Sequence, residues 1–181
     1  AVRRFVEQVR DEVAREGVIV PHVPLGCMIE VPSAALVADR LAREADFLSI
    51  GSNDLIQYAL AVDRGNSRVA YLHDPWHPAV LQLVRMAVDA GRQVGIPVSF
   101  CGEMSSDPLG ALTLLGLGVT RFSCTPSQIS MVRETVAAAS AQRWSELVEE
   151  ALSLPTGREI HDSVDAEASR LLPWRLGGAP A

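Results

Sequence analysis

The chain has 181 residues, of which 48% are hydrophobic, and this content can bury one core and suits a single domain. A formal net charge of −6 offers no basic stripe to a phosphate backbone, which excludes nucleic acid as an expected partner. No apolar run approaches the roughly 20 residues that cross a bilayer, and the N-terminus does not resemble a signal peptide. We therefore expect a cytoplasmic protein without membrane insertion.

The first predicted element is a helix over residues 2–15. Its apolar residues, among them Val2, Phe5, Val9 and Val13, recur at helical spacing, and Gly17 follows as a stop signal. The chain starts within this helical pattern and without an initiating Met. We interpret it as a piece of a longer protein.

From residue 25 onward, apolar runs typical of strands alternate with helical patterns. The predicted strands cover 25–31, 47–51, 97–101 and 119–124, and the predicted helices cover 34–42, 55–62, 79–94, 108–115 and 127–139. A polar loop with several Gly, Asn and Pro residues covers 63–78. This order predicts an α/β fold with about four parallel strands, each followed by a helix. It corresponds to the C-terminal half of a TIM-type (β/α)8 barrel, in which reactive groups gather at the carboxyl ends of the strands.

The end of the chain is predicted to carry one more amphipathic helix, over residues 144–152, followed by a polar stretch. We therefore divide the chain into a partial barrel domain, residues 1–152, and a polar C-terminal tail, residues 153–181. The last few residues are expected to be disordered.

Two acidic residues follow neighbouring strands. Glu30 ends the first strand and Asp54 follows the second. Two carboxylates from adjacent strands suit an open magnesium site, but helix-capping or ion-paired acids would give the same pattern. The spacing leaves both interpretations open.

Three further residues in the same regions have side chains suited to binding or proton transfer. Asn53 lies at a predicted helix start, which favours a phosphate or carboxylate. Arg64 could bind a carboxylate through two hydrogen bonds, or it could be a solvated loop residue. Cys101 ends the third strand, where a thiol could exchange a proton with a carbanion, act as a nucleophile or simply pack.

The remaining cysteines and histidines indicate no metal or disulfide framework. Three cysteines, Cys27, Cys101 and Cys124, are an odd number without a Cys-x-x-Cys pair, so we expect reduced thiols. His73 and His77 are four residues apart, but Pro75 between them prevents the helix that would direct both at one zinc ion.

Several runs, taken in order, resemble one known family. They are Met-Ile-Glu-Val-Pro at 28–32, Ser-Ile-Gly-Ser-Asn-Asp-Leu at 49–55, Ala-Val-Asp-Arg at 61–64 and Cys-Gly-Glu-Met at 101–104. Together they resemble the phosphoenolpyruvate-binding domain of enzyme I of the bacterial phosphotransferase system, over roughly residues 26–136. The chain is identified as a member of this family that is truncated at its N-terminus.

The resemblance implies a set of roles. Glu30 and Asp54 would bind Mg²⁺, Asn53, Asp54 and Arg64 would hold phosphoenolpyruvate, and Cys101 would protonate the enolate of pyruvate. The family transfers the phosphoryl group to a histidine in its own N-terminal portion and then to the carrier protein HPr for sugar uptake. It also forms homodimers through this domain. None of the four histidines here lies in a context similar to that acceptor.

Some features depart from the family or leave alternatives open. The arginines that bind phosphate on earlier barrel strands of the family have no counterpart here, so the chain alone is predicted to be inactive. Pyruvate, phosphate dikinase and phosphoenolpyruvate synthase share the barrel and similar motifs, although the Ala-Val-Asp-Arg-Gly-Asn run resembles enzyme I more closely. A non-catalytic dimerisation module is a further alternative.

Overall fold

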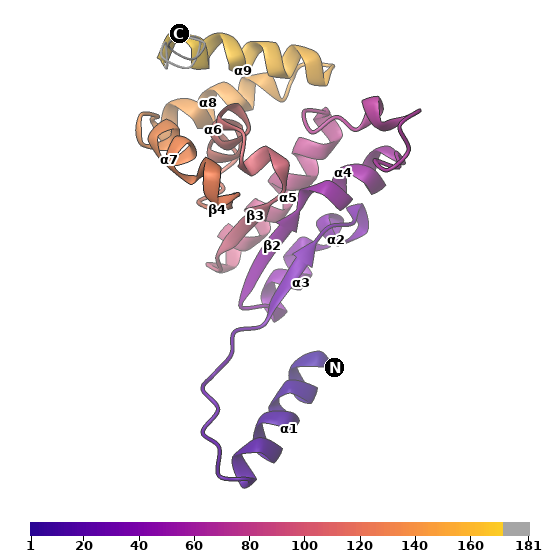
Figure 1. The fold of residues 1–181 in the computed structure, drawn as a ribbon, viewed down its shortest axis with the longest axis vertical. Coiled ribbons are helices and arrows are strands. Elements are labelled where there is room, and N and C mark those ends of the chain that lie inside the picture. The colour runs from indigo at the N-terminus through magenta and orange to yellow at the C-terminus, as the bar shows by residue number, and fades with distance from the viewer. Residues whose placement is uncertain (172–181) are drawn as a thin grey trace.

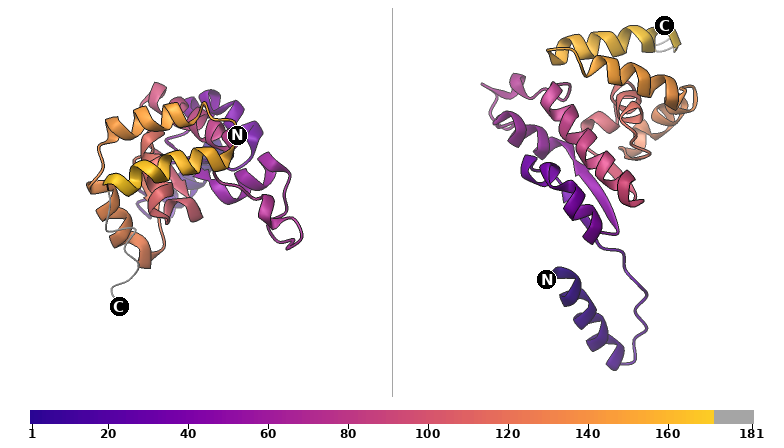
Figure 2. Two further views of the ribbon diagram at one scale, coloured as in Figure 1. Left: turned by 90° about the horizontal axis from the view of Figure 1, so that it is seen from above. Right: turned by 180° about the vertical axis from the view of Figure 1, so that it is seen from behind.

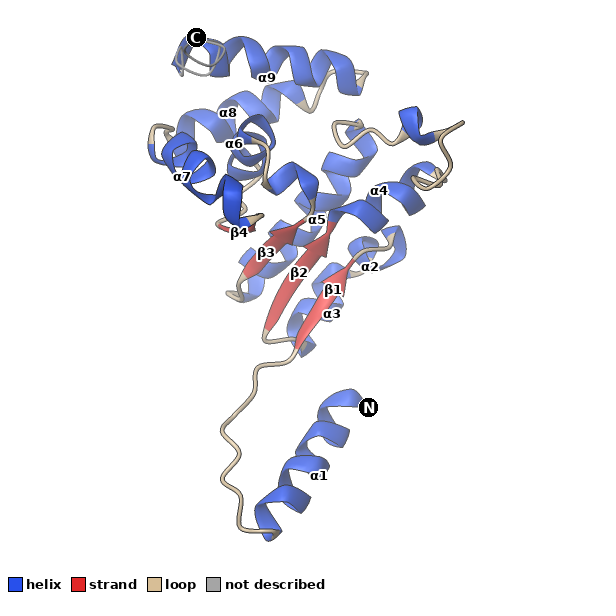
Figure 3. Ribbon diagram, viewed as in Figure 1, coloured by secondary structure: helices blue, strands red, loops and turns tan. Residues whose placement is uncertain are grey.

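A computed structural model describes residues 1–171 of the chain. Its centre is a parallel sheet of four strands in the order β1-β2-β3-β4 (Figure 1, Figure 3). The strands are β1 (Gly26–Ile29), β2 (Phe47–Gly51), β3 (Val98–Cys101) and β4 (Arg121–Ser123). The α-helices of the described residues are α1 (Val2–Arg15), α2 (Pro32–Leu36), α3 (Ala38–Glu44), α4 (Ser52–Leu60), α5 (Pro78–Val94), α6 (Pro108–Gly116), α7 (Ile129–Ala137), α8 (Ala141–Ala151) and α9 (Gly157–Leu171). Short 3-10 helices are η1 (Ala70–Leu72), η2 (Glu103–Ser105) and η3 (Pro126–Gln128).

This architecture confirms the predicted fold class. Four parallel strands alternate with helices, as in half of a TIM-type barrel. The strand order follows the chain order, so each βα unit lies beside the preceding one. Within residues 1–171, no helix has both the length and the hydropathy needed to span a membrane.

The two faces of the sheet are different. One face, here called the covered face, carries Ile29, Leu48, Ile50, Val98 and Phe100, all no more than 8% exposed. Helices lie over this face, as the view from behind shows (Figure 2). Because strand side chains alternate between faces, the residues between them point the other way. This second face, the open face, carries Met28, Ser49, Gly51, Ser99 and Cys101.

Some local predictions require correction. The helix predicted over 34–42 is two helices, α2 and α3, which are separated at Val37, where φ is −117° and ψ is 21°. The predicted last strand is shorter than expected and covers Arg121–Ser123.

The C-terminal stretch contains a helix that the sequence pattern did not predict. Helix α9 packs against α8 and α6 and buries Ile160, Val164 and Ala168. Between them, Arg143 of α8 donates hydrogen bonds to Glu167 of α9 at 2.7 and 3.1 Å. The division into a barrel domain and a tail remains a prediction, and the expected disorder of the last residues falls at positions 172–181, outside the described residues.

Helix α1 has the predicted bounds but lies apart from the sheet (Figure 1). None of its residues is buried. Arg3 connects it to the rest of the fold by donating hydrogen bonds to the Glu44 carbonyl at 2.9 Å and to Asp46 at 3.0 Å. Asp46 also accepts a hydrogen bond from the Leu25 N–H at 2.7 Å, and this bond, followed by that from Arg3, lowers the pKa of Asp46.

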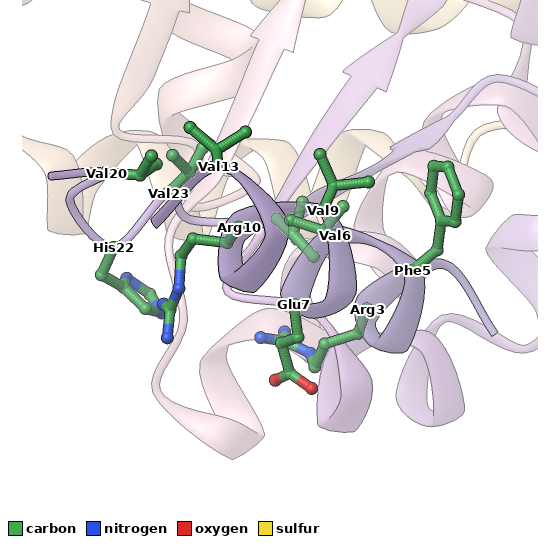
Figure 4. A pocket seen from close by; sticks show the side chains of 11 residues that line it. Arg3, Phe5, Val6, Glu7, Val9, Arg10, Val13, Val20, His22 and Val23 are labelled. Atoms are coloured by element: carbon green, nitrogen blue, oxygen red, sulfur yellow. The ribbon is translucent and has the colours of Figure 1, made fainter. Parts of the chain in front are cut away.

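An apolar groove of about 240 Å³ lies between α1 and the extended link at residues 18–25. Valines from both segments line it, together with Phe5 and a few polar side chains (Figure 4). The groove is at the opposite end of the sheet from the carboxyl ends of the strands (Figure 1). It is therefore separate from the predicted chemistry.

Candidate active site

The predicted site residues that follow β1, β2 and β3 lie along the carboxyl-end rim of the sheet. Gly51 pairs with Cys101 and Cys101 pairs with Ser123, while Ile29 pairs with Ile50 and so places Glu30 beside Gly51. Neighbouring strands are about 4.8 Å apart, so the backbones of Glu30 and Cys101 are about 10 Å apart, with Gly51 between them.

The side chain of Glu30 occupies the space that Gly51 leaves open. A Cβ atom at position 51 would lie 3.1 Å from Glu30 Cβ and 3.3 Å from its Oε2. Glycine at this position therefore allows the carboxylate to approach the backbone of β2 closely. The Glu30 side chain thus lies directly against the end of β2.

Asp54 lies in the first turn of α4, which begins directly after Gly51. Its side chain is half-buried, as is that of Glu30. Two carboxylates beside an open rim are hard oxygen donors, and Mg²⁺ in proteins is commonly held by one or two carboxylates together with waters and substrate oxygens. The donor set therefore fits magnesium. Within residues 1–171, no group of three or more His, Cys, Asp or Glu side chains could hold a metal by itself.

Asn53 and Cys101 are joined through Ser52 and Gly102. The buried hydroxyl of Ser52 donates a hydrogen bond to the Cys101 carbonyl at 3.1 Å. Gly102 has a φ of 138°, and a Cβ atom there would overlap Ser52 Oγ and lie 3.2 Å from Asn53 Oδ1. The start of α4 and the end of β3 therefore meet at a point where only glycine fits.

The thiol of Cys101 faces the open side of the sheet and is half-buried. Its Sγ donates a hydrogen bond to the Ile50 carbonyl at 3.3 Å, and Ser49 Oγ lies 3.9 Å from the same sulfur. Both contacts come from β2, the neighbouring strand. The thiol is thus held at the rim and is not enclosed in the helix-covered core.

A cleft of about 700 Å³ opens beside this rim. It is lined by Asn53, Gly102, Glu103, Ser106, Asp107, Pro108, Ser123, Cys124, Thr125, Gln128 and Met131. Among the predicted site residues, Asn53 contributes to this lining. Glu103 was not assigned a role from the sequence, although its position directly after Cys-Gly could have suggested one.

Arg64 lies away from this group of side chains. It is exposed in the loop after α4, and its backbone N–H donates to Gln57 Oε1 at 3.4 Å. Among the described residues, its guanidinium forms no ion pair. Its role in binding a carboxylate remains a prediction.

The loop that contains Arg64 is attached at its far end to the start of α4. The His73 ring donates from Nε2 to the Asn53 carbonyl at 3.3 Å. His77 instead caps α5, because its Nδ1 accepts a hydrogen bond from the Ala79 N–H at 3.2 Å. The two histidines therefore have different hydrogen-bond partners.

The same loop also contacts α9. The rings of Trp76 and His161 meet edge to face, with centroids 5.0 Å apart. The C-terminal helix therefore buttresses the segment that holds the Asn53 backbone.

The chain is similar to a family of known proteins over most of its length. A family model described as "PEP-utilising enzyme, PEP-binding domain" matches residues 1–141. A phosphoenolpyruvate-protein phosphotransferase of Listeria monocytogenes is 44% identical over 143 residues, which are 79% of this chain and 25% of that protein. One of Cupriavidus necator is 46% identical over 132 residues, 73% of this chain and 22% of that protein.

A multiphosphoryl transfer protein of Xanthomonas campestris is 45% identical over 140 residues, 77% of this chain and 17% of that protein. The chain thus spans about a quarter or less of the length of these relatives.

Proposed function

The chain belongs to the PEP-utilising enzyme family, and from this premise we propose that it is part of a phosphoenolpyruvate-protein phosphotransferase, enzyme I. The observation that carries the proposal is the arrangement of Glu30, Asn53, Asp54 and Cys101 along one rim, where Gly51 and Gly102 allow the side chains of Glu30 and Ser52 to lie close to the strand ends. These side chains supply a cation site, a polar anchor and a proton donor. Phosphoryl transfer from an enol phosphate uses the first two, and protonation of the enolate that it releases uses the third.

Glu30 and Asp54 are proposed to hold Mg²⁺. The metal would supply Lewis-acid stabilisation of the charge that develops on the phosphate and on the enolate oxygen. The two carboxylates orient the substrate indirectly, since they fix the position of the ion relative to β1 and α4. Their half-buried positions reduce competition from bulk water.

Asn53 and Arg64 are proposed to bind phosphoenolpyruvate itself. The Asn53 amide lies at the cleft wall and can donate to a phosphate or carboxylate oxygen. Arg64 can pair with an anionic oxygen of the substrate through its guanidinium. The His73 hydrogen bond to the Asn53 carbonyl couples that loop to the start of α4.

Cys101 is proposed to complete the reaction. As the phosphoryl group leaves, the enolate of pyruvate forms, and the Cys101 S–H bond breaks while a C–H bond forms on the enolate carbon. The phosphoryl group passes to a histidine elsewhere in the enzyme and then to HPr. We further propose that the enzyme is a cytoplasmic homodimer that serves sugar uptake.

Substitutions in the full-length phosphotransferase test these roles. We expect Glu30→Gln, Asp54→Asn and Cys101→Ala each to lower the rate of HPr phosphorylation by about 100-fold or more, because each removes a group that acts in the transition state. Glu150→Gln, at an exposed position on α8, is the matched control and should leave the rate unchanged. Full activity of the Glu30 and Asp54 variants, with unchanged Mg²⁺ dependence, would refute the proposal.

The isolated 181-residue chain provides a second test. We propose that it does not phosphorylate HPr in the presence of phosphoenolpyruvate and Mg²⁺, since the cationic groups that the family places on other strands are missing from it. Transfer of ³²P from phosphoenolpyruvate by the isolated chain would contradict this.

A further inference from the structure

Ser49 lies beside Cys101, the proposed proton donor, and no role was predicted for it from the sequence. It is on β2, two residues before Gly51, and it therefore shares the open face with Cys101. Ser49 pairs with Ser99 in the register, so Cys101 is its diagonal neighbour on β3. Ser49 Oγ is 3.9 Å from Cys101 Sγ, and either atom can be the donor.

The other contact of the sulfur suits only the protonated thiol. Cys101 Sγ donates to the Ile50 carbonyl at 3.3 Å, and a carbonyl oxygen can accept but cannot donate. When the S–H proton leaves, that oxygen faces a negatively charged sulfur. Within residues 1–171, the Ser49 hydroxyl is the side-chain donor that lies within hydrogen-bonding distance of this sulfur.

We propose that Ser49 is a positioning residue for Cys101. Its hydroxyl keeps the thiol directed at the rim and donates a hydrogen bond to the thiolate that remains after proton transfer. In that step the S–H bond breaks, a C–H bond forms on the enolate carbon and the electron pair stays on sulfur. Ser49 keeps its own proton, and the thiolate regains one from solvent water. The catalytic part of this inference rests on the proposed function, but the contact between Ser49 and Cys101 does not.

Ser99 offers a matched control on the neighbouring strand. It is also half-buried on the open face, directly opposite Ser49. Its Oγ, however, donates to the Leu48 carbonyl at 3.3 Å and makes no hydrogen bond to the sulfur. Ser99→Ala removes one hydroxyl from the open face, as Ser49→Ala does, but it leaves the contact between Ser49 and the Cys101 thiol in place.

The first test uses the 181-residue chain and needs no activity. Alkylation of each cysteine by iodoacetamide is followed by mass spectrometry across a range of pH, with Cys27 and Cys124 as internal references. For Ser49→Ala we expect the pH midpoint of Cys101 alkylation to move upward and the rate at neutral pH to fall about fivefold, since a hydrogen bond to a charged group is lost. Ser49→Thr, which keeps the hydroxyl, should restore the profile, and Ser99→Ala should leave it unchanged.

The pH midpoint separates this role from simple steric access. A larger opening around the sulfur would raise the plateau rate without moving the midpoint, and that result would overturn the proposal. An unchanged profile for Ser49→Ala would also overturn it. A shift of equal size for Ser99→Ala would show that general polarity, and not the Ser49 contact, controls the thiol.

The second test uses the full-length phosphotransferase. Ser49→Ala should lower kcat several-fold and leave the KM for phosphoenolpyruvate unchanged, with rescue by Ser49→Thr. If Cys101→Ala retains full activity, the proposed proton donor is wrong, while the alkylation profile still reports on Ser49 and Cys101. If Cys101→Ala is inactive but Ser49→Ala has wild-type kcat, the positioning role fails and the proposed function stands.

Discussion

The covered and open faces of the sheet come from the same four strands but differ in what they carry. On the covered face, Leu48, Ile50 and Phe100 are no more than 1% exposed and pack under the helices. On the open face, Met28 is 48% exposed, and Ser49, Ser99 and Cys101 are half-buried. The period of two along a strand assigns neighbouring residues to these two environments.

The difference shows how a strand can serve both stability and chemistry. Apolar side chains on the covered face hold the backbone in register, and this register brings Glu30, Gly51 and Cys101 into one row. Within residues 1–171 the open face is not covered by helices, and it carries small, polar and reactive groups. Substitutions on the two faces should therefore have different consequences.

The largest effect is expected on the covered face. Phe100→Ala removes a side chain that is 1% exposed, and it should lower the free energy of unfolding by about 3–5 kcal/mol. Urea denaturation of the chain measures this. Cys101→Ala, at the next residue on the open face, is the matched control and should cost far less. Equal losses for the two variants would break the distinction between the faces.

A smaller loss of stability is expected at Gly102, which lies at the rim directly after β3. Gly102→Ala forces a Cβ into a φ of 138° and into Ser52 Oγ, so it should cost at least about 1–3 kcal/mol. Ser52→Ala removes the overlapping atom. In a double-mutant cycle the two losses should therefore be less than additive. Strict additivity of the unfolding free energies would contradict the contact.

Gly51→Ala is expected to change stability still less but to weaken Mg²⁺ binding clearly. The Ala side chain would meet Glu30 Cβ and Oε2 at 3.1 and 3.3 Å, so Glu30 must move by a few tenths of an ångström. We expect less than about 1 kcal/mol in stability but a roughly tenfold or greater loss of Mg²⁺ affinity in the full-length enzyme. Titration of activity with Mg²⁺ measures the latter. An unchanged Mg²⁺ requirement would show that the position of Glu30 against β2 is unimportant.

The smallest effect is expected at the amino end of the sheet, where Asp46 connects α1 to the fold. The folded-state pKa of Asp46 is lowered, first by the Leu25 N–H and then by Arg3. Its contribution to stability is therefore present above its ordinary pKa of 3.8 and is lost as the pH falls through the lower folded-state value. We expect proteolysis of the link at residues 18–25 to accelerate below about pH 4 with an acid-stable protease.

Asp46→Asn should produce the same acceleration at neutral pH, because it weakens the ion pair to Arg3. Asp39→Asn is the matched control, since within residues 1–171 Asp39 forms its ion pair with Arg43 on the same helix, 3.8 Å away. No change in proteolysis for Asp46→Asn would show that α1 is held by other contacts.

Much of the fold was predictable because its signals are local. The apolar runs of the strands, the Asp107-Pro108 start of α6 and the spacing of apolar residues in α1 and α5 identify these elements without reference to the rest of the chain. The break at Val37 and helix α9 were not predictable in this way. Helix α9 is largely polar, and its few apolar residues are buried because α8 and α6 lie against it.

The amino-acid sequence shows which residue types follow each strand, and it therefore indicated Glu30, Asn53, Asp54 and Cys101 as candidates. Tertiary structure alone decided which of them are neighbours, because strand register depends on pairing between distant segments. Ser49 beside the Cys101 thiol and Ser52 against Gly102 are contacts between residues about 50 positions apart. Such contacts produce no local pattern in the sequence. They form only when packing on the covered face has set the register of the strands.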